Sequence, residues 1–105
     1  MITFEAMCQM ASVEPGELER WIAERWVLPE SESSSYVFTE FDVARVRLIV
    51  ELRRDLAVDE EAVPIVLRLL DQLYATRRRM RSVLRALESL PEEHRAAVRR
   101  HFSED

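Results

Sequence analysis

The scarcity of glycine constrains the fold of this chain more than any other feature. Gly16 is the only glycine among 105 residues, and only four prolines accompany it. Because these two residues disfavour helix interiors most, their scarcity favours long helices over sheet and loop. Hydrophobic residues make up 48% of the chain and charged residues 33%, which is typical of one small globular domain, alone or with an extra helix. The sequence therefore predicts a mostly α-helical protein.

Start signals place two helices close together near the beginning of the chain. Thr3 stands where the cap of a first helix is expected, and residues 11–13 form a tight connection. Pro15 then occupies the first position of a second helix, where its missing N–H costs nothing, with Val13 or Glu14 as the cap. This order is that of a helix-turn-helix, in which the second helix reads DNA.

A small hairpin and a third helix are expected next. The β-prone stretches 26–28 and 36–38 flank the polar segment 30–35, so we expect the two stretches to pair as a wing. Thr39 and Asp42 form a close relative of a capping box, which opens the third helix. The apolar face of that helix is predicted to follow Phe41, Ala44, Arg45, Leu48, Ile49, Leu52 and Leu56.

A heptad-like pattern runs along the following helix. Asp59 is predicted to cap this helix, and Pro64 is predicted to kink it or reset its start. Ser89 and Glu92 are the ends of a predicted capping box for a last short helix. The pattern favours a helical hairpin or a two-stranded coiled coil, with Arg77 as a charged interruption. We expect its apolar positions to join two copies of the chain; they are Val66, Leu70, Leu73, Met80, Leu84 and Leu87.

The predicted organisation has three parts. Residues 1–58 are expected to form a winged helix-turn-helix module, and residues 59–90 a long helix for dimerisation or partner binding. Residues 91–105 are expected to form the short helix and a tail that frays.

Charge is unevenly distributed along the chain. All 15 basic residues are arginine, and the net charge is −5. Residues 1–35 hold seven acids and two arginines, residues 36–75 hold eight acids and five arginines, and residues 76–105 hold five acids and eight arginines. An acidic body with a basic tail does not suit general nucleic-acid binding, which needs a basic face. It suits a basic protein partner, or two copies arranged head to tail.

The arginine-rich stretch 77–85 is the best candidate for a nucleic-acid contact. No aromatic residues interleave it, and the rest of the chain is acidic. We therefore interpret it as a solvated helix face, or as one that pairs with acids of a neighbouring helix.

No catalytic or metal-binding set stands out in the sequence. Cys8 is the single cysteine, which excludes an internal disulfide and a cysteine cluster, and it is read as a small buried residue. His94 and His101 lie too far apart on one helix to chelate a metal directly. We expect no enzymatic activity, no cofactor and no metal. No apolar run is long enough to cross a bilayer and no signal segment opens the chain, so we expect a cytoplasmic protein without a membrane partner.

Two stretches, VEPGELERWIAERWVLPE and YVFTEFDVARVRLIVELRRDLAVDEEAVPIVLRLLDQL, resemble the MerR-like winged helix-turn-helix. The second is similar to the CbpM-type chaperone modulators, most specifically at residues 52–56 and 67–73. The resemblance covers about residues 2–90. It implies a mostly α fold with a small β-hairpin wing and a C-terminal coiled-coil helix. It also implies an inhibitor of a DnaJ/CbpA-like co-chaperone that binds its J-domain and needs no cofactor.

The sign of the charges at the second helix favours that reading. A MerR-type DNA reader typically begins this helix with Ser-Pro-Arg-x-Leu-Arg, whereas residues 14–19 read Glu-Pro-Gly-Glu-Leu-Glu. Glutamates repel phosphates but complement the basic helix of a J-domain, so we expect DNA to be an unlikely partner. The predicted J-domain contacts are Asp55, Asp59, Glu60, Glu61 and Asp71.

The alternative hypothesis is a MerR-like transcriptional regulator that binds DNA as a dimer and senses a ligand through its tail. The fold and the arginine-rich stretch favour it, and the acidic second helix opposes it.

Overall fold

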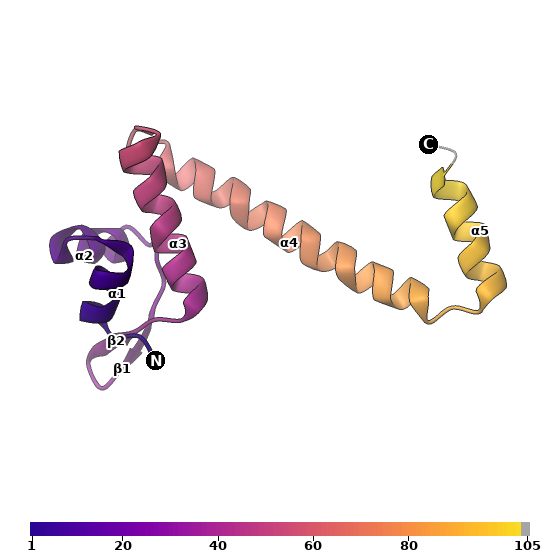
Figure 1. The fold of residues 1–105 in the computed structure, drawn as a ribbon, viewed down its shortest axis with the longest axis horizontal. Helices are drawn as coiled ribbons and strands as arrows, with labels where there is room; N and C mark the ends of the chain where they lie inside the picture. The colour runs from indigo at the N-terminus through magenta and orange to yellow at the C-terminus, as the bar shows by residue number, and fades with distance from the viewer. Residues whose placement is uncertain (104–105) are drawn as a thin grey trace. The chain divides into compact units, whose positions relative to one another are not determined.

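The computed structural model describes residues 1–103. Two compact units divide the chain: unit 1 comprises Met1–Leu67 and unit 2 comprises Arg68–Asp105. The mostly α-helical winged helix-turn-helix that the sequence predicts is confirmed (Figure 1). The elements in chain order are α1 (Phe4–Ala11), α2 (Pro15–Ala23), β1 (Glu30–Glu32), β2 (Ser35–Val37), α3 (Glu40–Val50), the π-helical segment η1 (Glu51–Asp55), α4 (Val63–Glu88) and α5 (Glu92–Ser103).

The helix-turn-helix of unit 1 is α1 and α2, and its start signals act as predicted. Thr3 Oγ1 accepts a hydrogen bond from the Ala6 N–H at 3.1 Å and so caps α1. Ser12 turns the chain with a left-handed backbone (φ 55°). Glu14 then caps α2, and Pro15 occupies its first position. In Figure 1, α1 and α2 lie beside α3, against which α1 packs.

The core of unit 1 is built by α1, α2, α3, the start of α4 and residues of the loops that join these elements. Met7 of α1 and Leu18 of α2 are fully buried, and the rings of Trp21 and Trp26 stack with centroids 6.3 Å apart. The start of α4 belongs to this core through Val63 and Leu67. The other core members are Ala11, Val13, Val27, Phe38, Val43, Val46 and Ile49.

The wing uses different residues from those predicted. We expected 26–28 to pair with 36–38, but Glu30–Glu32 pairs with Ser35–Val37 around a turn at Ser33 and Ser34. After α2, Arg25 adopts a left-handed backbone (φ 65°) and the chain enters the core, where Trp26 is only 5% exposed. Trp26 and Val27 are β-prone because one is aromatic and the other β-branched, but both are buried in the core instead of pairing in a strand.

The N-terminus completes the wing. Ile2 and Phe38 form an isolated antiparallel bridge, in which the Phe38 N–H donates to the Ile2 carbonyl at 2.9 Å. Figure 1 shows the N-terminus beside the hairpin. The N-terminal segment therefore lies next to β2, although the two are far apart in the sequence.

The start of α3 is confirmed, and its predicted apolar face is partly correct, because Ile49 and Leu52 are buried and Leu48 packs against the core. Thr39 Oγ1 accepts from the Asp42 N–H at 3.2 Å, and the Asp42 carboxylate accepts from the Thr39 N–H at 2.9 Å. Phe41 is 60% exposed and Leu56 is 62% exposed. Because the capping box buries Asp42 at the start of the helix, its inward face is rotated from the predicted one. The buried apolar positions are Val43, Val46, Ile49 and Leu52.

The predicted cap of α4 is also wrong. Asp59 lies three residues too early, because its backbone carbonyl accepts from the Ala62 N–H at 2.9 Å within a turn. The helix begins at Val63, with Pro64 at its second position, so the proline sets the start as predicted.

In unit 2, the predicted capping box at Ser89 does not form. Ser89 Oγ donates to the Ala86 carbonyl at 2.6 Å and so closes the end of α4. The Pro91 carbonyl accepts from the His94 N–H at 3.0 Å at the start of α5. Glu92 pairs with two arginines of its own helix, each at 2.7 Å, and these hydrogen-bonded guanidinium groups hold the pKa of its carboxyl below the ordinary value.

Replacing Leu18 by alanine tests the position of the core. Leu18 is fully buried between the helices, so Leu18→Ala should lower the free energy of unfolding by about 2–5 kcal/mol. Leu28 is 62% exposed, and Leu28→Ala should change the free energy of unfolding by less than about 0.5 kcal/mol. Urea denaturation followed by circular dichroism measures both. Equal losses for the two variants would contradict this core.

Candidate interaction surfaces

The glutamates at the start of α2 are not all available to a partner. The Glu17 carboxylate accepts from Arg54 Nη2 at 3.1 Å and from the Glu14 N–H at 3.4 Å. The Glu14 side chain accepts from the Glu17 N–H, so these two glutamates form the capping box of α2. Glu19 is exposed, and its carboxylate has no hydrogen-bonding or ionic partner within residues 1–103. Two of the three glutamates therefore stabilise the start of α2, and Glu19 is the one available to a partner.

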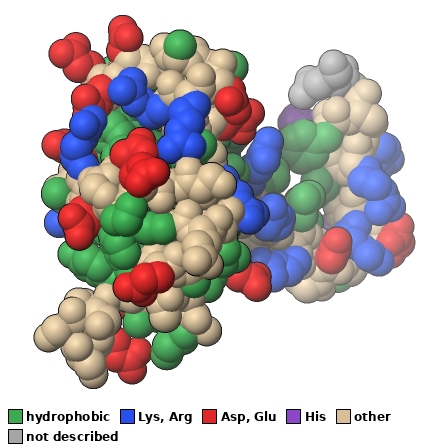
Figure 2. All heavy atoms as spheres, turned by 60° about the vertical axis from the view of Figure 1, so that its left-hand side comes forward, with side chains coloured by type: hydrophobic (Ala, Val, Ile, Leu, Met, Phe, Trp, Pro, Cys, Tyr) green, Lys and Arg blue, Asp and Glu red, His purple; other side chains and the backbone are tan. Residues whose placement is uncertain are grey.

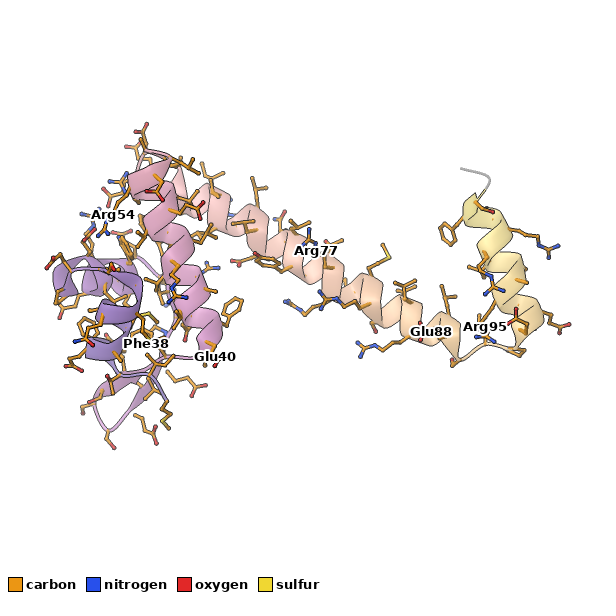
Figure 3. The ribbon with its side chains drawn as sticks, in the orientation of Figure 1. Phe38, Glu40, Arg54, Arg77, Glu88 and Arg95 are labelled. Atoms are coloured by element: carbon orange, nitrogen blue, oxygen red, sulfur yellow. The ribbon has the colours of Figure 1, made fainter. Side chains whose placement is uncertain are left out.

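The arginines of unit 1 bind other parts of the same unit. Arg54 illustrates this, because its Nη1 donates to the Ser12 carbonyl at 2.8 Å while its Nη2 bonds Glu17. In Figure 3, Arg54 lies on η1 beside the α1–α2 corner. Four other arginines have comparable partners: Arg47 with the Met10 carbonyl (3.2 Å), Arg45 with the Trp26 carbonyl (2.5 Å), Arg53 with the Val58 carbonyl (2.7 Å) and Arg20 with the Glu60 carboxylate.

Acids outnumber arginines in unit 1. The unit contains fourteen acids and six arginines, a net charge of −8. Arg25 is the one arginine of the unit that has no such partner among the described residues. On the face that Figure 2 presents, arginine side chains lie among acidic ones. The net charge of unit 1 therefore has the same sign as that of a phosphate backbone.

The predicted partner-binding acids gather in one exposed segment, with one exception. We call residues 55–61, which run from the last residue of η1 toward α4, the acidic turn. It contains Asp55, Asp59, Glu60 and Glu61, and the side chain of Leu56 in the same segment is exposed. Glu60 is engaged with Arg20, and the other three carboxylates have no partner among the described residues. The exception, Asp71, lies on α4 in unit 2. No finding tests their role, which stays a prediction.

The heptad positions of α4 are exposed or half-buried. Leu73, Met80 and Leu84 are exposed, whereas Val66, Leu70 and Leu87 are half-buried. This stripe stays our predicted contact between two copies. Sequence reasoning missed that Leu84 and Leu87 also line an apolar groove with Val98 and Phe102 of α5.

The arginine-rich stretch of α4 is unpaired within the described part of unit 2. Arg77, Arg78, Arg79, Arg81 and Arg85 are all exposed, and none contacts a carboxylate there. Figure 3 shows Arg77 on α4 well away from either end of the helix. The interpretation of this stretch as a solvated helix face fits these positions.

The side chains that could carry chemistry do not converge. No three His, Cys, Asp or Glu side chains within residues 1–103 form a group that could hold a metal ion. Cys8 is half-buried beside the core, and burial, with the charges of Glu5, Glu14 and Glu19, raises the pKa of its thiol. Because the thiolate is the reactive form, these surroundings make Cys8 a poor nucleophile.

A second hollow lies at the N-terminus of unit 1, where no prediction placed a site. It is formed by three segments that the sequence separates: Met1–Glu5, Glu19 of α2 and Ser34–Val37 of the hairpin. No local motif marks it, because its residues are brought together by tertiary contacts, among them the bridge between Ile2 and Phe38 and the packing of Phe4 against Tyr36.

Comparison with known families shows that residues 2–85 match the MerR HTH family of regulatory proteins. The chain belongs to this family. The MerR-like superfamily predicted from the sequence is thus confirmed, and the narrower resemblance to CbpM-type modulators stays a prediction. No curated protein and no solved structure matches this MerR-family protein. Over the described residues, no helix has the length and apolar character needed to span a membrane.

Arg54→Gln tests the contacts at the α1–α2 corner. Because Arg54 satisfies both the Ser12 carbonyl and the Glu17 carboxylate, this variant should lower the free energy of unfolding by about 1 kcal/mol. Arg25→Gln, which removes an unpaired arginine, should change it by less than about 0.5 kcal/mol. Urea denaturation of both proteins gives the comparison. Indistinguishable stabilities would show that the corner does not depend on Arg54.

Proposed function

We propose that this MerR-family protein binds the J-domain of a DnaJ/CbpA-like co-chaperone and inhibits it. The observation that carries the proposal is the net charge of −8 on unit 1, together with the engagement of five of its six arginines in internal contacts. A surface of this sign attracts a cationic polypeptide and repels a nucleic acid. The resemblance to CbpM-type modulators names the J-domain as that polypeptide.

The acidic turn is the part of unit 1 best suited to this contact. Asp55, Asp59 and Glu61 are exposed and unpaired, so a basic helix can approach them without breaking an internal ion pair. Leu56 adds an exposed apolar side chain among the carboxylates. An apolar contact surrounded by complementary charges is a common arrangement in protein interfaces. Binding there would be steered by charge and therefore weakened by salt.

Isothermal titration with a purified J-domain tests the proposal. The wild-type chain should bind, and its affinity should fall as NaCl rises from about 50 mM to about 300 mM. The triple variant Asp55→Asn, Asp59→Asn, Glu61→Gln should bind at least about tenfold more weakly at low salt, because three complementary charges are removed.

Glu40→Gln is the matched control. Glu40 is an exposed acid at the start of α3, at the opposite end of that helix from η1 and the acidic turn (Figure 3), so its neutralisation should leave the affinity almost unchanged. Absence of binding by the wild-type chain at low salt would refute the proposed function. Equal losses for Glu40→Gln and the triple variant would refute the acidic turn as the contact.

A DNA-binding regulator is the second candidate function. The family match supports it, as do the five exposed, unpaired arginines of α4. These arginines lie in unit 2, outside the helix-turn-helix, so the contact would be made by α4. Such a contact would bind phosphates without reading bases through α2.

A gel-shift assay on duplex DNA at low salt separates the two candidates. For a J-domain modulator, we expect no shift at protein concentrations of tens of micromolar, roughly the range in which nonspecific DNA binding is detected. A shift that Arg78→Gln and Arg81→Gln together abolish would establish the second candidate instead. Arg25→Gln serves as the control, because Arg25 is an unpaired arginine outside α4.

A further inference from the structure

The hollow at the N-terminus of unit 1 has features that point to a ligand. It has a volume of about 390 Å³, which is within the lower range of small-molecule sites. Its walls come from the N-terminal segment, from α2 and from the hairpin. The lining includes two acids, Glu5 and Glu19, and two aromatic residues, Phe4 and Tyr36.

One wall of the hollow is formed by two aromatic rings in contact, and it is partly accessible to solvent. The rings of Phe4 and Tyr36 have centroids 6.4 Å apart and are tilted by 33°. The ring centroid of Phe38, which is buried, lies 6.5 Å from that of Phe4 and 6.4 Å from that of Tyr36. Phe38 therefore packs against both rings from the core. Tyr36 remains 40% exposed. An accessible ring face attracts a cation through its quadrupole.

The acidic wall is unpaired. Glu5 and Glu19 are exposed, and neither carboxylate contacts a cation within residues 1–103. Glu5 comes from α1 and Glu19 from α2, and their charges both act on the thiol of Cys8, a residue of α1 that packs against the core. The internal arginines of unit 1 therefore leave these two carboxylates unneutralised beside an aromatic surface.

We propose that this hollow receives an arginine or lysine side chain presented by a basic protein partner. The carboxylates of Glu5 and Glu19 would hold the cationic group, and the rings of Phe4 and Tyr36 would contact it and its aliphatic stem. The charge of unit 1, −8 overall, favours a cationic protein as the source of that side chain. The identity of the partner rests on the proposed function, whereas the cation specificity of the hollow does not.

The specificity is tested with a small probe in place of the partner. N-acetyl-arginine amide is titrated into the full chain, and the ring signals of Phe4 and Tyr36 are followed by nuclear magnetic resonance. N-acetyl-citrulline amide is the neutral isostere. We expect the arginine probe to shift both rings and the citrulline probe to leave them unchanged. The double variant Glu5→Gln, Glu19→Gln should require about tenfold more arginine probe for the same shift.

Two controls separate binding from misfolding. Glu24→Gln removes an exposed acid at the end of α2 that does not line the hollow, and it should behave as the wild type. Tyr36→Leu keeps an apolar side chain but removes the ring, and it should weaken the response of Phe4 about threefold. Far-ultraviolet circular dichroism confirms that each variant is folded. Equal shifts with the two probes, or rings that respond to neither, would overturn the proposal.

The J-domain then tests the source of the cation. If the wild-type chain binds it, the double variant should bind about three- to tenfold more weakly, and Glu24→Gln should not. An unchanged affinity of the double variant would overturn this hollow as a docking site for that partner. If the arginine probe binds but the J-domain does not, the proposed function fails and the cation specificity is upheld.

Discussion

Guanidinium groups that cross from α3 and η1 to the helix-turn-helix hold α1 and the turn after it to the rest of unit 1, around the buried core. Arg47 and Arg54 donate to the carbonyls of Met10 and Ser12, which lie at the end of α1 and in the turn after it. Carbonyls at a helix end have no partner within the helix, so a neighbouring donor stabilises them. Arginine suits this role because one side chain can reach two acceptors in a fixed geometry.

The same contacts bear on function. An arginine held to a backbone carbonyl keeps its charge, but fourteen acids outnumber the six arginines of the unit, so unit 1 combines a MerR-family helix-turn-helix with a net negative charge. The acidic turn and the N-terminal hollow are then two places where carboxylates remain unpaired. Both proposals follow from this imbalance, and they concern different residues. A basic helix could engage the turn while a single basic side chain enters the hollow.

Features set by neighbouring residues could be predicted from the sequence, and features set by distant residues could not. The caps at Thr3 and Thr39 depend on hydrogen bonds across three residues, and both form as predicted. The prediction for the wing was wrong because Trp26 is buried in a core formed by residues distant in the sequence. The prediction for the apolar face of α3 was only partly correct, because packing against other elements determines which side of the helix is buried. The errors at Asp59 and Ser89 arose because a turn or the preceding helix end uses those residues instead.

The same division holds for the candidate sites. The acids of the turn could be found from the local sequence, because charged residues in a segment that joins two helices are usually exposed. The contact between Arg54 and Glu17 joins residues 37 positions apart, so no local sequence pattern predicts it. That contact also has a mechanical consequence. Since Arg54 directly precedes Asp55, one side chain ties the segment that carries the acidic turn to the corner between α1 and α2, and a load applied at the turn is transmitted to that corner.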